Sequence, residues 1–205
     1  MNKIYYKLAG VVVIMILVYN AIYIQKLSEM HSQQSHQFDF TAYADSLFHK
    51  GILPEDSIIG LGQLLNKYDQ NVDSAFARHG NRLGIGQSAY FMVKDSGKVI
   101  QKNNEGLTVL STEGQMVQLE TKFLFGNAIR DASKKVSLSD FKNNKEFNEL
   151  TEALNTLIRE QILPAQLGAL KVGDVITYKG AIKLSKRSKP EFSIYPIEIV
   201  AAGAR

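Results

Sequence analysis

The sequence predicts an α+β protein: an N-terminal transmembrane helix, a helical segment, and a small, partly open β-barrel with one long helix inserted before its last two strands. An uncharged apolar run lies near the N-terminus, and a helical repeat of apolar residues follows it. Alternating, β-favouring stretches then occur on both sides of one long amphipathic segment. Apolar residues make up 45% of the 205 residues and charged residues 21%, which is enough to fold around a core.

Residues 1–27 are predicted to be a signal anchor. Residues 8–24 carry no charge, and as a helix they would cover about 25 Å, the short end of what crosses a hydrocarbon core of about 30 Å. Lys7 and Lys26 can extend that reach to the headgroups. Lys3 and Lys7 precede the run without an acid, which favours a cytoplasmic N-terminus. We therefore expect a single-pass protein of the bacterial inner membrane, with a polar spacer at 28–37 and one domain, 38–205, in the periplasm.

A cleaved signal peptide is the alternative interpretation of this run. Such a peptide ends its apolar core at a small-x-small site, but Tyr19 occupies the relevant position before Asn20 and Ala21. The sequence therefore favours a retained anchor.

Composition excludes several classes of protein. Three of the 24 basic residues flank the apolar run, and the other 21 nearly match the 20 acidic residues, so we expect no nucleic-acid partner. The sequence contains no cysteine, which excludes disulfides, thiolate metal sites, catalytic thiols and lipid-modified cysteines within these residues.

Three helices are predicted in the domain. The first covers 38–51. The second covers 57–78, with Asp56 as its N-cap, because its apolar residues repeat at steps of three and four. A helical turn is expected near 126–131, and the third helix covers 139–162, where Pro164 should end it.

About four strands are predicted between 88 and 125. Their expected turns are at Asp95-Ser96-Gly97, at 103–106 and at 113–114. Two further strands, 174–184 and 192–200, follow the third helix. A meander, a helix and a closing strand pair are the order of a partly open barrel like the oligonucleotide/oligosaccharide-binding (OB) fold.

Several segments resemble a known family when taken in order: Phe38-Asp39, HGNRLGIGQSAYFMV (79–93), FGNAIRDA (125–132), DFKNNKEFNELTEALN (140–155) and 170–198. Together they resemble the domain-of-unknown-function family of predicted periplasmic lipoproteins, often encoded beside ribose-type sugar importers of the ATP-binding-cassette class. Family members typically carry a lipidated cysteine, which this sequence lacks. The resemblance implies an accessory role beside importer subunits or a substrate-binding protein, and no catalytic residues.

Two groups of basic residues are candidates for binding. Arg78 and Arg82 flank a glycine-rich turn and could clamp a carboxylate or phosphate, although basic residues after a helix also stabilise its dipole. Arg130 lies among apolar residues, which favours a structural role over ligand contact. We expect Arg130 and Asp131 to have separate partners, because adjacent residues rarely pair.

The second group is the basic cluster, Lys183, Lys186, Arg187 and Lys189, at the tip of the last hairpin. The strands around it give no structural reason for these charges. A solvated loop, contact with anionic headgroups and contact with an acidic partner are all compatible with it.

No catalytic residue, metal site or cofactor is predicted. The glycines of HGNRLGIG leave a helix instead of opening one, which is the reverse of a phosphate loop. The function expected is that of a non-catalytic binding or accessory protein. The family resemblance implies that it is an accessory component of a sugar importer. The alternatives are an envelope scaffold unrelated to transport, or a carbohydrate-processing enzyme. A cleft with two converging carboxylates would favour the enzyme, and an exposed apolar patch would favour docking.

Overall fold

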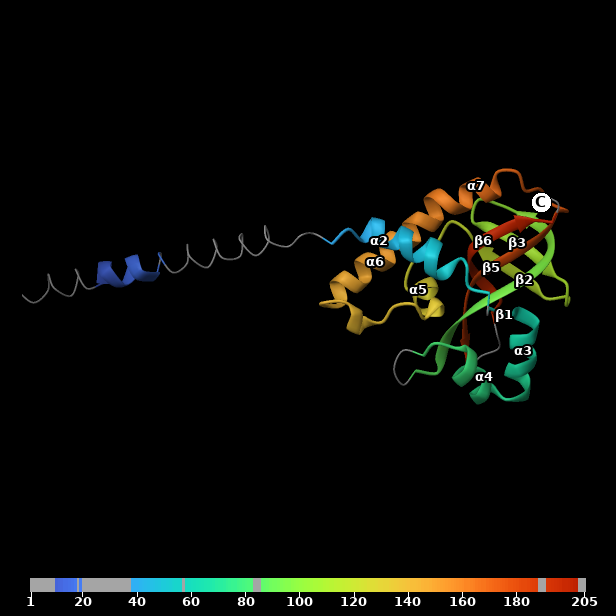
Figure 1. Ribbon diagram of the computed structural model, residues 1–205, viewed down its shortest axis with the longest axis horizontal. Helices are drawn as coiled ribbons and strands as arrows, with labels where there is room; N and C mark the ends of the chain where they lie inside the picture. Colours follow the sequence, from blue (N-terminus) through green and yellow to red (C-terminus); the bar gives the residue numbers. More distant parts are fainter. Residues whose placement is uncertain are drawn as a thin grey trace, which may run out of the picture. The chain divides into compact units, whose positions relative to one another are not determined.

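The computed structural model describes residues 10–17, 19, 38–56, 58–82, 86–187 and 191–202, and it divides into two units, Met1–Asp39 and Phe40–Arg205 (Figure 1). In the first unit residues 10–17 are helical. The rest of the predicted anchor and the spacer at 28–37 lie almost entirely outside the described residues. Among the residues described, no helix is both long and apolar enough to cross a membrane.

Five strands of the second unit close into a barrel. They are β2 (Ser88–Lys102), β3 (Gly106–Ser111), β4 (Met116–Glu120), β5 (Val175–Ser185) and β6 (Ser193–Ala201). Their order is β2-β3-β4-β6-β5, and β5 also pairs with β2. The prediction of a partly open barrel is therefore wrong. The barrel closes because β2 is long enough to pair with β5 from Ser88 to Lys98 and still reach β3.

The predicted turn at Asp95-Ser96-Gly97 is also wrong, because these residues lie inside the continuous strand β2. Hydrogen-bonded partners on both edges hold the segment extended, with Gly97 opposite Ile176 of β5 and Ser111 of β3. A Cβ at Gly97 would lie 2.3 Å from the Leu110 carbonyl oxygen. The glycine is therefore needed for close approach of two strands, and three strands, not four, lie between 88 and 125.

The predicted helix 57–78 is two helices, α3 (Leu61–Gln70) and α4 (Val72–His79). The chain breaks at Asn71, which is extended and whose side chain accepts a hydrogen bond from the Ser74 amide. Asparagine is a strong N-cap, and here it overrides the continuous apolar repeat. A two-residue strand, β1 (Ile59–Gly60), precedes α3 and pairs in parallel with β2.

The other predicted helices are present with shifted ends. Helix α2 (Phe40–Leu47) continues into a π-helical turn, and α5 (Ala128–Ser133) and α6 (Asn144–Leu157) follow the meander. A π-helical turn then leads into α7 (Leu163–Leu167). Pro164 does not end the helix as predicted, because it lies in the first turn of α7, where its missing N–H is not needed.

The core fills the barrel and continues under the helices. In Figure 1, α2 and α6 lie side by side, while α3 and α4 lie at the opposite end of the second unit. Phe91, Val109 and Ile182 are fully buried inside the barrel, and Phe48 and Leu154 join the same core from α2 and α6. Side chains thus occupy the barrel core.

Candidate functional site

Arg130 of α5 lies in a buried polar network. Its side chain is 5% exposed, its guanidinium is 2.8 Å from the Asp131 carboxylate, and it donates a hydrogen bond to the Thr151 hydroxyl at 2.6 Å. The guanidinium also lies 3.6 Å from the centroid of the Phe147 ring. The prediction of separate partners is wrong, since Arg130 and Asp131 pair with each other. Both residues lie on the short helix α5, and the contacts of Arg130 with Thr151 and Phe147 of α6 hold its guanidinium beside Asp131.

The network ties α5 to its neighbours. Asn127 donates a hydrogen bond to Asp131, and Asn81 donates one to the Asp131 carbonyl oxygen. The donors of Arg130 are thus directed at protein atoms. This geometry is what a structural role for Arg130 requires, and it leaves the guanidinium no open face toward solvent.

A basic hollow of about 280 Å³ lies between α4 and the end of α5. Its basic residues are Arg78, His79, Lys134 and Lys135. Apolar side chains, including Met92, line the rest of it together with Ser133 and Glu55. Arg78 therefore lines this hollow, but its predicted partner Arg82 does not. The Arg82 guanidinium donates a hydrogen bond to the Gly86 carbonyl oxygen at 2.8 Å within its own loop.

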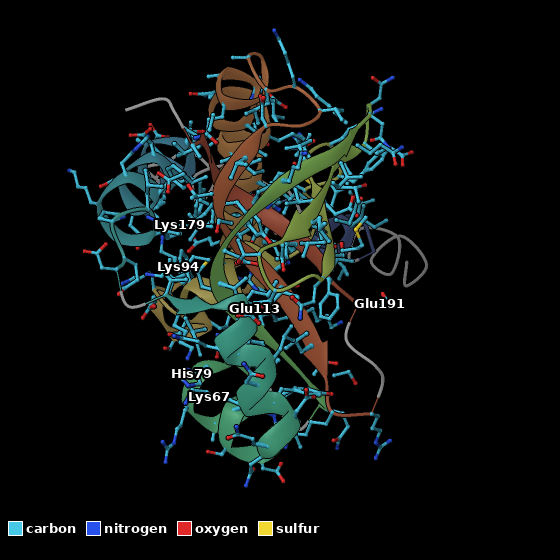
Figure 2. The ribbon with its side chains drawn as sticks, turned by 90° about the vertical axis from the view of Figure 1, so that its right-hand side faces the viewer. Lys67, His79, Lys94, Glu113, Lys179 and Glu191 are labelled. Carbon is cyan, nitrogen blue, oxygen red and sulfur yellow. The ribbon has the colours of Figure 1, made fainter. Side chains whose placement is uncertain are left out.

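His79 lines this hollow, and three cations act on it. Figure 2 shows His79 and Lys67 on the neighbouring helices α4 and α3. Burial lowers the pKa of His79, and the charges of Lys67, Lys134 and Arg78 lower it further. Burial also lowers the pKa of Lys134. Burial thus disfavours the charged forms of both His79 and Lys134, and the neighbouring cations disfavour that of His79 further.

The basic cluster is less free than the sequence suggests. Lys186 forms an ion pair with Asp73 of α4 and lies 5.3 Å from the centroid of the Phe76 ring. This contact lowers the pKa of Asp73. The prediction that the fold has no use for these charges is thus wrong for Lys186, because α4 packs beside the end of β5. Lys183 lies 5.7 Å from the centroid of the Tyr90 ring.

Arg187 is exposed at the end of β5, and Lys189 lies outside the described residues. The part of the cluster that faces solvent among the described residues is accordingly Lys183 with Arg187.

A second hollow, also of about 280 Å³, contains the two acids that most resemble a catalytic pair, Asp95 and Glu198. Glu198 pairs with Lys179 at 3.2 Å, and Asp95 accepts a hydrogen bond from the Tyr178 hydroxyl at 3.4 Å. Burial raises the pKa of Asp95 and that of Tyr178. Figure 2 labels Lys94 and Lys179, which both line this hollow. Each acid thus has its own partner, and the described residues hold no group of three or more metal-ligating side chains.

The outer face of the barrel carries an exposed apolar strip, made of Leu110, Met116, Val175 and Val200. Met116 is 51% exposed and Val175 is 50% exposed. Strand register places these residues in one row: Met116 is opposite Leu110, Lys98 is opposite both Leu110 and Val175, and Val200 is opposite Thr177, two residues from Val175. The strip therefore consists of two apolar pairs with Lys98 between them. Sequence reasoning missed this strip because alternation marks which residues face outward, but register decides which of them are neighbours.

Comparison with known protein families shows which family the chain belongs to. Residues 12–200 match the family described as predicted periplasmic lipoprotein (DUF2291). The chain belongs to this family. The description agrees with the extracytoplasmic location predicted from the charges around the N-terminal run. No curated protein matches the chain.

The fold also has a solved counterpart. The crystal structure of an OB-fold protein from Thermotoga maritima is similar, with a TM-score of 0.70 and 22% identity. The similarity covers 80% of this chain and 98% of that one. At this identity the likeness establishes the fold alone: an α+β protein built on a closed five-stranded OB-type barrel.

Proposed function

We propose that the protein is a non-catalytic docking protein, held at the outer side of the inner membrane by its N-terminal segment, and an accessory component of a sugar importer of the ATP-binding-cassette class. The apolar strip on the barrel carries this proposal. Leu110, Met116, Val175 and Val200 all lie on strands, so the strip is rigid and already formed without a partner. Exposed apolar surface with polar groups around it is typical of protein interaction sites.

The polar surroundings of the strip fit a protein partner. Lys98 lies within the strip, and Thr108 and Gln118 border it and bond to each other at 3.0 Å. Such a rim is usual around the apolar centre of an interface. The importer is chosen as the partner because family members are often encoded beside one.

In-cell photo-crosslinking from the full-length chain tests the docking surface. A photoreactive residue at Val175 should capture a subunit of the importer or its substrate-binding protein. The same residue at Lys145, which is 84% exposed on α6, serves as the matched control and should not. Val200→Glu should abolish capture at Val175 and leave the thermal midpoint nearly unchanged, because exposed substitutions usually move stability by less than about 0.5 kcal/mol. Equal capture from both positions, or no importer subunit from Val175, would contradict the proposal.

The basic cluster is proposed to add a second, salt-sensitive contact, either to anionic headgroups or to an acidic face of the partner. A triple change to Gln at Lys183, Arg187 and Lys189 keeps Lys186, which the fold uses. It should weaken vesicle binding or crosslinking, and high salt should weaken both in the unchanged protein, because exposed charges are screened within about 10 Å at 0.1 M. If neither measurement responds, the cluster is a solvated loop.

The retained anchor is tested separately. We expect the protein to stay with the membrane after a carbonate wash and to keep its original N-terminus. A mature N-terminus at Ala21 or later would show that the segment is a cleaved signal peptide.

A further inference from the structure

We propose that the basic hollow between α4 and α5 is a binding site for a small phosphate-bearing ligand, with Arg78 and Lys134 as its charged contacts and His79 between them. This proposal does not depend on the importer or on the apolar strip. Phosphate carries close to two negative charges at neutral pH and accepts hydrogen bonds on several oxygens, which suits a guanidinium and an ammonium approaching from different elements.

Within the described part of the chain, two cations of this hollow, Arg78 and Lys134, have no carboxylate partner, whereas a third has one. Lys135 pairs with Glu55 at 2.6 Å across one end. For Arg78 and Lys134, no carboxylate lies within 4 Å among the residues that the structure describes, and the same holds for Lys67 beside His79. Like charges placed together without counterions repel one another, so this grouping is unfavourable until an anion arrives.

The backbone holds these groups in place. Arg78 and His79 occupy the last turn of α4, whose end is set by the hydrogen bond from the Gly80 amide to the Phe76 carbonyl oxygen. Lys134 follows α5 in the left-handed conformation, with φ of 56°. That turn redirects the chain so that Lys134 and Lys135 face the end of α4 instead of continuing along α5. A left-handed lysine is uncommon, and Asn or Gly would be easier there.

The size of the hollow limits the ligand. A volume of about 280 Å³ is just below the usual range of roughly 300–1,000 Å³ for small-molecule pockets. The apolar part, formed by Ile58, Ile59, Met92 and Ala132, can cover one face of a small organic group. A phosphate esterified to a small organic group is therefore a better fit than a long chain.

His79 makes the site sensitive to pH. The groups facing it are Lys67 from α3, Arg78 on its own helix, and Lys134 after α5, with the Lys135–Glu55 pair further along the same hollow. Burial and the charges of these three cations lower the pKa of His79 in the empty site. A bound phosphate offsets them, which favours protonated His79, and by linkage phosphate binds more tightly as the pH falls.

The test is an NMR titration of the histidine Cε1 protons of the full-length protein in non-ionic detergent, with inorganic phosphate as the probe. Saturating phosphate should raise the pKa of His79 by about 1, the low end of the effect of an opposite charge within 4–6 Å. Sodium chloride at the same ionic strength should not. His49, which lies 3.6 Å from Asp45 on α2, is the internal control and should be unaffected.

Substitutions locate the effect. Lys134→Gln and Arg78→Gln should each reduce phosphate affinity at least tenfold, whereas Lys145→Gln makes the same charge change on α6 and should leave affinity unchanged. Because Arg78 and Lys134 are exposed, these variants should fold, and an unchanged His49 signal checks that they do.

Three results would overturn the site: no movement of His79 with phosphate, equal movement of His49, or equal affinity in Lys134→Gln. A response of His79 to phosphatidylglycerol vesicles but not to free phosphate would also overturn it, since the hollow would then contact lipid headgroups.

Discussion

Replacing Arg130 by Met should destabilise the domain by about 3–5 kcal/mol, the usual result of removing one partner of a buried ion pair. Met retains much of the packing against Phe147, but the Asp131 carboxylate stays 2% exposed and loses its charge partner at 2.8 Å. The hydroxyl of Thr151 also loses the hydrogen bond donated at 2.6 Å. For a domain of this size, each kcal/mol moves the thermal midpoint by roughly 2–4 °C, which gives a fall of about 6–20 °C.

Urea unfolding of the full-length chain in non-ionic detergent, followed by far-UV circular dichroism, measures this free energy. Lys145→Met is the matched control, because it breaks an exposed pair 3.7 Å apart and should cost less than about 0.5 kcal/mol. Adding Asp131→Leu to Arg130→Met should recover part of the loss, since no buried charge is then left alone. A single change that costs under about 1 kcal/mol, or a double change that costs the sum of both singles, would refute the network as described.

Three further changes test the core, the barrel and its titration. Leu154→Ala should cost about 2–5 kcal/mol, because Leu154 is fully buried in α6; under half a kcal/mol in urea unfolding would mean that α6 packs differently. Gly97→Ala should cost at least about 1–3 kcal/mol, since its Cβ meets the Leu110 carbonyl oxygen at 2.3 Å; an unchanged midpoint would mean that β2 and β3 are further apart. Asp95→Asn should stabilise the domain at pH 7 and lose that advantage at pH 3, because burial raises the pKa of Asp95 and so favours its neutral form in the folded state; a gain that is independent of pH would contradict this.

The positions of most barrel strands along the chain could be predicted, because local signals there agree with the tertiary structure. Turn residues at 103–106 do separate β2 from β3, and those at 113–114 separate β3 from β4. The alternation at 174–184 and 192–200 does mark β5 and β6. Closure could not be predicted, because it depends on which strands pair, and Ser88–Lys98 meets Val175–Ser185 only in the folded chain. The same pairing forces Asp95-Ser96-Gly97 to be extended despite its turn-favouring composition.

The ends of the helices were also predicted incorrectly. Asn71 interrupts an unbroken apolar repeat because its side chain satisfies an amide at the start of α4. Periodicity records which face is buried, and it is preserved when two short helices cover the same surface. A capping residue inside a periodic segment was the signal that could have located the break.

The candidate binding residues also differ in how far local sequence could identify them. Arg78 was found from sequence because it follows a helix beside glycines, but its neighbours in the hollow come from α5, more than 50 residues later. Lys134 and Lys135 gave no sequence signal, since a pair of lysines after a short helix is ordinary surface. Only the left-handed turn at Lys134 brings them to face Arg78 and His79. Arg82 had the same sequence argument as Arg78, but its guanidinium donates a hydrogen bond to the Gly86 carbonyl oxygen. Charge alone therefore does not select a binding residue; what separates Lys134 from Arg82 and Lys186 is that the fold gives the latter two a partner and leaves Lys134 facing a cavity.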